Sequence, residues 1–221
     1  MGHLIWSIKN QCVMRTILFL VLTLVIASCG KKRTIHITAT NGATGEPYAG
    51  LQYFVVSSTT TGDGEKYKTE KSGFLNENGE ATEVVREKQF RTYAVRVVEP
   101  ENSCYNKEIT MYFGGANDKN GHFDFVFAEC AYLKFRYQNI SCQGASDHIE
   151  ITRITNLDGY TGFYNPAVYD GCIDYTMPDY VQVPMGYWYF SWDVTKNGIT
   201  NSFSDTIFLN VGEQKYYEFN Y

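Results

Sequence analysis

Short segments of alternating apolar and polar residues, separated by tight turn signals, run through the chain from Thr34 to its end. These segments are rich in β-branched and aromatic residues, and pairs such as Asn78-Gly79 and Asn197-Gly198 separate them. Side chains of a strand point alternately to opposite faces, so this pattern predicts strands with one buried face. No segment has a convincing helical period. The pattern therefore predicts an all-β fold of antiparallel sandwiches.

The expected strands fall into two groups. In the first half they are residues 34–39, 51–57, 81–86, 92–99, 108–113 and 122–128. In the second half they are residues 132–138, 148–154, 181–183, 188–194, 199–203, 206–210 and 215–220. Each group has the length of one sandwich of roughly 100 residues. We therefore expect two tandem Ig-like β-sandwich domains, residues 34–129 and 131–221.

An uncharged, mostly apolar run of 13 residues, Thr16–Ser28, precedes this region and follows Lys9 and Arg15. A helix that crosses a bilayer needs about 20 apolar residues, whereas a secretion signal needs about 7–15 after a basic start. Residues 1–28 are therefore expected to be a cleaved signal peptide. Met1 and Met14 both remain open as the true start.

The end of this run, Ile26-Ala27-Ser28-Cys29, resembles the lipobox of Gram-negative bacterial lipoproteins. The resemblance implies that Cys29 becomes the first residue, carries the acyl chains and is followed by a tether, residues 29–33. Gly30 after the cysteine implies the outer membrane, and Lys31-Lys32-Arg33 favours its periplasmic face over the cell surface. The alternative is an ordinary signal peptide with Cys29 incidental.

A second resemblance covers the first expected domain. Residues 35–51, with Asn41-Gly42 and Thr44-Gly45-Glu46-Pro47, followed by residues 76–81 and the alternation at residues 93–97, resemble the carboxypeptidase regulatory-like, or transthyretin-like, sandwich. Residues 183–190 and 211–219 resemble the late strands of the same fold. The resemblance implies an accessory domain rather than a catalytic one. The second domain could equally be a different β-sandwich.

The cysteines of the expected mature chain number four: Cys104, Cys130, Cys142 and Cys172. An even count in an exported chain indicates two disulfides. The strand order places Cys104 and Cys130 at one end of a sheet, whereas residues 132–138 hold Cys130 and Cys142 about 23 Å apart. We predict the pairs Cys104–Cys130 and Cys142–Cys172. Zinc is the rival interpretation, but the chain has no C-x-x-C pair.

Composition and motifs exclude several functions. The net charge is −5, and it becomes −7 on removal of residues 1–28, which hold two basic residues and no acidic one. Charged residues make up 19% of the chain against a usual 25%, so a cationic surface for nucleic acid is not expected. Sequence motifs of catalytic or phosphate-binding sites are absent. His36, His122 and His148 have no second histidine at ligand spacing, and Asp118 to Gly121 forms a turn rather than a calcium loop. We expect no enzyme activity, cofactor or metal.

The segment Leu157–Tyr180 is the most informative candidate for a ligand site. It is long and without strong periodicity, and long loops on a β scaffold are where binding residues concentrate. Aromatic rings and carboxylates suit a glycan or a protein partner. Two other interpretations stay open, namely that the segment only covers the end of the sandwich or that it binds calcium. The candidate ligand-binding residues are Tyr160, Tyr164, Tyr169, Asp170, Asp174 and Tyr175.

Two further features lie on expected strands. In Tyr187–Trp192, period two sends Trp188, Phe190 and Trp192 into the core, and leaves Tyr187 and Tyr189 for contact with the other domain, solvent or a ligand. Asp205-Thr206-Ile207 resembles an O-glycosylation acceptor of some bacterial envelopes, which makes Thr206 a candidate site.

The sequence thus predicts a non-catalytic, lipid-anchored envelope protein that acts as a binding or scaffolding module. Its expected partners are the membrane, through the lipid anchor, and an envelope protein or glycan. One alternative is a glycan-binding accessory lipoprotein. Another is a pilus-type subunit.

Overall fold

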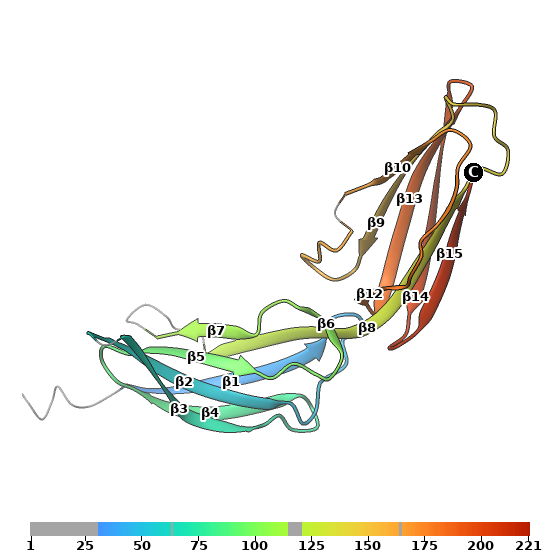
Figure 1. Cartoon of the computed structure of the whole chain (residues 1–221). Helices are drawn as coiled ribbons and strands as arrows, with labels where there is room; N and C mark the ends of the chain where they lie inside the picture. Colours follow the sequence, from blue (N-terminus) through green and yellow to red (C-terminus); the bar gives the residue numbers. More distant parts are fainter. Residues whose placement is uncertain (1–30, 63, 115–120, 164) are drawn as a thin grey trace, which may run out of the picture.

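The computed structural model describes residues 31–62, 64–114, 121–163 and 165–221, and within these ranges the regular structure consists of β-strands alone (Figure 1). None of the described residues forms a helix long and apolar enough to cross a membrane. The strands are β1 Lys31–Asn41, β2 Gln52–Thr61, β3 Gly64–Phe74, β4 Glu80–Glu87, β5 Thr92–Val97, β6 Ser103–Asn106, β7 Thr110–Phe113, β8 His122–Gln138, β9 His148–Thr155, β10 Ala167–Asp170, β11 Asp174–Thr176, β12 Val181–Pro184, β13 Gly186–Lys196, β14 Ile199–Leu209 and β15 Gln214–Asn220.

The first half of the chain packs two sheets against each other. One contains β4, β1, the first part of β8 and β6, and the other has the order β3-β2-β5-β7. Strand β1 shows why these residues form strands, because Ile35, Ile37 and Ala39 are fully buried while their neighbours are not. Together with residues such as Val95 and Phe125 they form the first core.

The second half repeats the strand order of the first. In both halves the first strand pairs in parallel with the last and antiparallel with the fourth: β1 with β8 and β4, then β8 with β15 and β11/β12. The facing sheets, β3-β2-β5-β7 and β10-β9-β13-β14, are also ordered alike. Rings dominate the second core, where Phe135 lies 5.8 Å from the centroids of Phe163, Phe190 and Phe219.

Strand β8 is shared by the two halves, as Figure 1 shows. The sequence predicted separate strands at residues 122–128 and 132–138, which leaves a break at residues 129–131. That prediction of a break was wrong, since β8 is one strand of 17 residues. Its alternation is lost because adjacent residues, Phe127 with Ala128 and Cys130 with Ala131, are buried where the strand passes from one core to the next.

A third hydrophobic cluster joins the two halves. Tyr105, Ala128, Leu157 and Met185 are buried there, and the Tyr105 hydroxyl donates to the carbonyl oxygen of Asp158 at 2.7 Å. These residues come from β6, β8 and the segments that flank the second sheets. The junction is therefore packed as well as covalently continuous.

The predicted tether was too long. Lys31, Lys32 and Arg33 belong to β1, where they pair with Glu87, Arg86 and Val85 of β4. Arg33 is buried, forms an ion pair with Glu87 and lies 5.8 Å from the Phe113 ring. A run of three basic residues resembles an exposed linker, but the acidic partner on the neighbouring strand allows it to enter the sheet. Cys29, Gly30 and the predicted signal peptide lie outside the described residues.

Several strands were missed or divided in the sequence analysis. Strand β3 was missed because it is a charged edge strand exposed on both faces, so it shows no alternation of burial. Strands β6, β10 and β11 are short, and β14 is a single strand where two were expected. The hairpin predicted at Asn197-Gly198 is present, and both residues have the positive φ that this turn requires.

The Leu157→Ala variant tests the packed junction. Leu157 is 4% exposed, and truncation of a buried leucine costs about 2–5 kcal/mol. We expect a lower free energy of unfolding in urea and a broader distribution of shapes in small-angle scattering. The exposed Val211→Ala change should alter neither; equal effects of the two substitutions would contradict the proposed role of the junction.

Candidate functional site

The segment predicted to bind a ligand, Leu157–Tyr180, contains two short strands. Strand β10 pairs with β9, and β11 pairs with β8, so the segment runs along two sheets of the second half instead of standing free as a loop. The expectation of an irregular loop was wrong over these residues. Three or four residues are too few to show period two against their flanks.

The tyrosines of the segment contact the second core. Tyr169 lies 4.6 Å from the Tyr137 ring, and Tyr160 packs edge-on against Trp188 at 5.9 Å. Burial raises the pKa of both Tyr160 and Tyr169. Tyr175 stacks at 6.3 Å from Tyr137 and remains 44% exposed. Much of the surface of these rings is therefore used to cover the second core. Tyr164 lies outside the described residues.

The predicted carboxylates are held by neighbouring strands. Asp170 lies 2.7 Å from His148 Nδ1. Asp174 accepts from Nε and Nη2 of Arg136 at 2.8 Å each, and this pairing lowers the pKa of Asp174. The rings of Tyr169 and Tyr175 lie close together, with centroids 6.1 Å apart. The two carboxylates do not share a partner, since Asp170 contacts His148 and Asp174 contacts Arg136. Ligand binding by these residues stays a prediction.

Both predicted disulfides are present. Cys104 and Cys130 are bonded with their Cα atoms 4.8 Å apart, and Cys142 and Cys172 with theirs 5.2 Å apart. The first bond links β6 to β8, which are paired in the sheet. The second connects the segment after β8 to the turn between β10 and β11.

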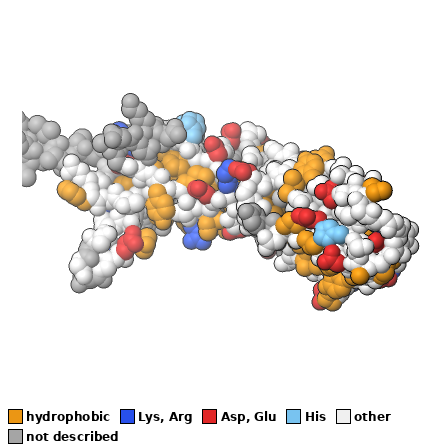
Figure 2. Space-filling model, turned by 90° about the horizontal axis from the view of Figure 1, so that it is seen from above, with side chains coloured by type: hydrophobic (Ala, Val, Ile, Leu, Met, Phe, Trp, Pro, Cys, Tyr) orange, Lys and Arg blue, Asp and Glu red, His pale blue; other side chains and the backbone are white. Residues whose placement is uncertain are grey.

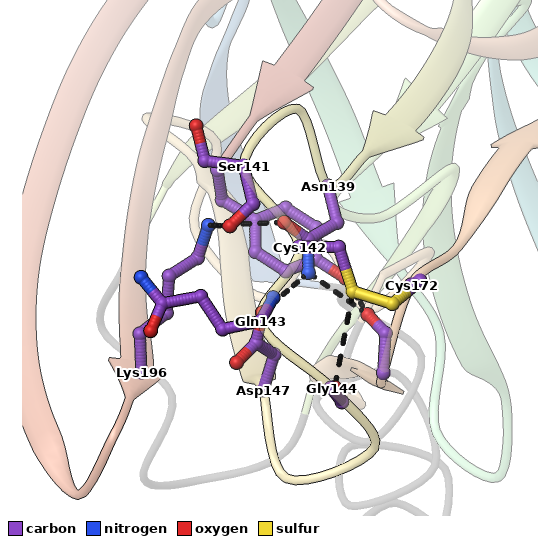
Figure 3. Close-up of a disulfide and its surroundings, with 10 residues drawn as sticks. Asn139, Ser141, Cys142, Gln143, Gly144, Asp147, Cys172 and Lys196 are labelled. Carbon is purple, nitrogen blue, oxygen red and sulfur yellow. Dashed lines mark hydrogen bonds between the residues drawn. A yellow bond between two sulfur atoms is a disulfide. The ribbon is translucent and has the colours of Figure 1, made fainter.

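Polar side chains surround the second disulfide (Figure 3). Asp147 is fully buried and accepts hydrogen bonds from the backbone N–H of Gln143 and from Asn139 Nδ2, both at 2.9 Å. Lys196 Nζ donates to Asn139 Oδ1 at 2.9 Å and to the Ser141 carbonyl at 3.0 Å. The hydrogen bonds lower the pKa of Asp147. This network fixes the connection between β8 and β9.

The aromatic strand Tyr187–Trp192 divides as period two predicts. Trp188 and Phe190 are buried, Trp192 is half-buried, and the Trp188 indole donates to the Pro184 carbonyl at 3.1 Å. Tyr187 and Tyr189 are exposed, stack at 6.3 Å from each other and face away from the second core. Tyr187 also packs edge-on against Phe208, at 4.8 Å between ring centroids, and Phe208 packs against the cluster that joins the two halves.

Two surface features were missed from sequence. Strands β1 and β8 place His36 beside His122, with ring centroids 4.8 Å apart, although the residues are far apart along the chain. Tyr67 and Tyr112 stand at opposite edges of the sheet β3-β2-β5-β7. No local sequence pattern predicts either arrangement, because the pairing of strands distant in sequence decides where these residues lie relative to each other.

The surface is mixed in character. Figure 2 shows hydrophobic side chains interspersed with acidic and basic ones on the face in view, rather than one continuous apolar area. Among the described residues there is no group of three or more His, Cys, Asp or Glu residues that could hold a metal ion. The Thr206 residue is exposed on β14.

Comparisons with known proteins give only distant similarities. No family model matches the chain, and no curated protein matches its sequence. Similar solved structures include the Bacillus anthracis TIE protein, with 11% identity, a TM-score of 0.33 and coverage of 86% of this chain and 34% of that one. The shaft pilin SpaA from Lactobacillus rhamnosus GG has 8% identity, a TM-score of 0.34 and coverage of 86% and 98%. The minor pilin GBS52 of Streptococcus agalactiae has 10% identity, a TM-score of 0.31 and coverage of 85% and 94%.

This chain therefore spans about a third of the length of the TIE protein. Two of the three proteins are named as pilins. At these TM-scores the likeness carries no argument about function.

The Asp147→Asn variant tests the network in Figure 3 by its pH dependence. Because the pKa of Asp147 is lowered on folding, its carboxylate stabilises the fold above the unfolded value near 3.8 and loses that effect as the pH falls through the folded value. We expect a thermal midpoint below that of the wild type at pH 6, with the difference shrinking below about pH 4. The exposed Asp193→Asn change is the control, and a difference independent of pH would contradict the assignment.

Proposed function

We propose that this chain is a non-catalytic, lipid-anchored protein of the bacterial envelope, in which two tandem transthyretin-like sandwich domains form a stiff body that carries binding surfaces. The single observation that carries the proposal is the shared strand β8, which pairs in parallel with β1 in one half and with β15 in the other. Backbone pairing holds each part of β8 in a sheet, and the buried cluster around Leu157 and Met185 restrains the junction between the two halves. Such a body suits a spacer or scaffold.

The position of the proposed anchor fits this function. One residue, Gly30, would separate Cys29 from β1, and β1 begins at the end of the first half opposite the junction (Figure 1). An acylated Cys29 would hold that end at the outer membrane and direct the second half away from it. Lys31 and Lys32 are exposed beside the proposed anchor, where they would meet anionic headgroups of the periplasmic face.

The polar contacts of the predicted site support a non-catalytic role. Asp170 and Asp174 are engaged by His148 and Arg136, and their partners come from well-paired strands. A general acid or base needs a pKa near the working pH, whereas pairing with Arg136 lowers the pKa of Asp174. The partner we propose is an envelope protein or glycan, with no nucleic acid. The exposed Thr206 supports the proposal of an O-glycan on β14.

The Cys29→Ser variant tests the anchor. It should move from the membrane fraction to the soluble envelope fraction, and the mature wild-type protein should show a mass increase for acyl chains, which Cys29→Ser should lack. A further mass increase that disappears in Thr206→Ala would support the glycan. A Cys29→Ser protein that stays in the membrane fraction would overturn the anchored function.

One observation favours the pilus-type subunit as a second candidate. Strand β14 is 11 residues long and, among the described strands, pairs only with β13, so one of its edges presents free backbone groups. Open edges of this length can accept a strand of another copy.

Crosslinking in intact cells separates the two candidates. A pilus-type subunit should give a ladder of multimers. Thr206→Pro removes the N–H that donates to Asp205 Oδ1 at 2.7 Å and places a proline ring in the middle of β14, so it should abolish the ladder. The matched Thr206→Ala change should keep it. Crosslinked monomers or hetero-complexes alone would favour the anchored scaffold.

A further inference from the structure

The outer face of the sheet β3-β2-β5-β7 carries a groove between two exposed tyrosines. Tyr67 on edge strand β3 is 71% exposed and Tyr112 on edge strand β7 is 73% exposed. Ser58 lies opposite Tyr67, and Ala94 lies opposite Tyr112, in the registers of their strands. The groove has a volume of about 330 Å³, which is at the lower end of the range for small-molecule sites.

Small residues form the floor of this groove. Ala94 points away from the first core, because its neighbours Tyr93 and Val95 belong to that core. It is nevertheless buried, with 3% of its surface exposed, and Ser58 is also buried, at 8%. Small side chains between two tall rings leave depth where larger ones would fill the space.

The shape and the rings favour a sugar over a protein partner. A stable protein interface buries about 800 Å² on each side, which is more than a groove of this size offers. The faces of a pyranose carry C–H groups that pack on aromatic rings, and the rings of Tyr67 and Tyr112 are largely unoccupied. Hydroxyl groups of Thr92 and Thr110 line the same groove and match sugar hydroxyls, whereas the Ser58 hydroxyl hydrogen-bonds to the Glu65 carboxylate.

Charge selects the kind of sugar. Arg96 is the charged residue that lines the groove, and within the described ranges its guanidinium has no ion pair or hydrogen bond. A guanidinium binds carboxylate or phosphate through two parallel hydrogen bonds. In a chain of net charge −5, an unpaired arginine beside two exposed rings is complementary to an anionic ligand.

The acidic side chain near the groove lies at its other end. Glu65 accepts a hydrogen bond from the Tyr67 hydroxyl at 2.6 Å, which fixes the ring. Thr92, which is opposite Ser58 and so level with Tyr67, precedes Arg96 by four residues, or about 13 Å of strand. An anionic group at Arg96 would therefore be well separated from Glu65.

We propose that this groove binds an acidic sugar, with the pyranose ring against Tyr112 and Tyr67 and its carboxylate on Arg96. The site lies in the first half, away from the Leu157–Tyr180 segment, and does not depend on the lipid anchor or on the pilus-type alternative. The groove thus assigns acidic sugars as the ligand class of the envelope protein.

Calorimetric titration of the purified full-length protein in detergent tests the site. The probes are oligomers of galacturonic acid, glucuronic acid and sialic acid, each paired with its methyl ester, which keeps the rings and removes the charge. At least one acid should bind, and its ester at least tenfold more weakly. Arg96→Gln, Tyr67→Ala and Tyr112→Ala should each weaken binding at least tenfold, while Tyr187→Ala, an exposed tyrosine of the second half, should leave it unchanged.

Three results would overturn the proposal. One is the absence of binding by every acidic oligomer; another is equal binding of acid and ester. The third is competition by inorganic phosphate at the same concentration as the sugar, because the groove would then bind any anion and would not recognise the pyranose ring. Thermal midpoints of the variants should match the wild type, since the substituted side chains are exposed.

Discussion

The backbone pairing of β8 is the interaction on which the rest of the structure depends. Its first part is the last strand of the first half and pairs with β1, and its second part is the first strand of the second half and pairs with β15. A parallel partner in each half means that neither core can form without this strand. The disulfide at Cys130 and the buried cluster at the junction act on the same strand, so covalent, hydrogen-bonded and hydrophobic restraints coincide there.

Aromatic residues serve different purposes in the two halves. In the second half, rings such as Phe135, Trp188 and Tyr169 pack on each other, so its high tyrosine content is largely consumed by the core. In the first half, Tyr67 and Tyr112 stand on the outer face with small residues between them. The two most exposed tyrosines of the described residues are thus both in the first half, and the groove between them also holds an unpaired positive charge.

Local patterns predicted the elements that have one buried face. The strand at Ile35 to Ala39, the split of Trp188 from Tyr187 and the Asn197-Gly198 turn all follow from alternation and turn chemistry, which depend on neighbours in sequence. The cysteine pairs could also be predicted, because the strand order placed Cys104 and Cys130 at one end of a sheet and residues 132–138 kept Cys130 from reaching Cys142. Strand β3 could not, since an edge strand exposed on both faces carries no period.

The sequence by itself determined that the chain is all-β, where its disulfides form and which face of the strongly alternating strands is buried. The tertiary structure alone decided that β8 is continuous, that Arg33 enters the sheet and that the Tyr160 and Tyr169 rings cover a core. It also decided that Tyr67, Arg96 and Tyr112 share one groove. The physical reason is that alternation reports whether a face is buried, whereas strand register, which spans long separations in sequence, determines what lies beside it.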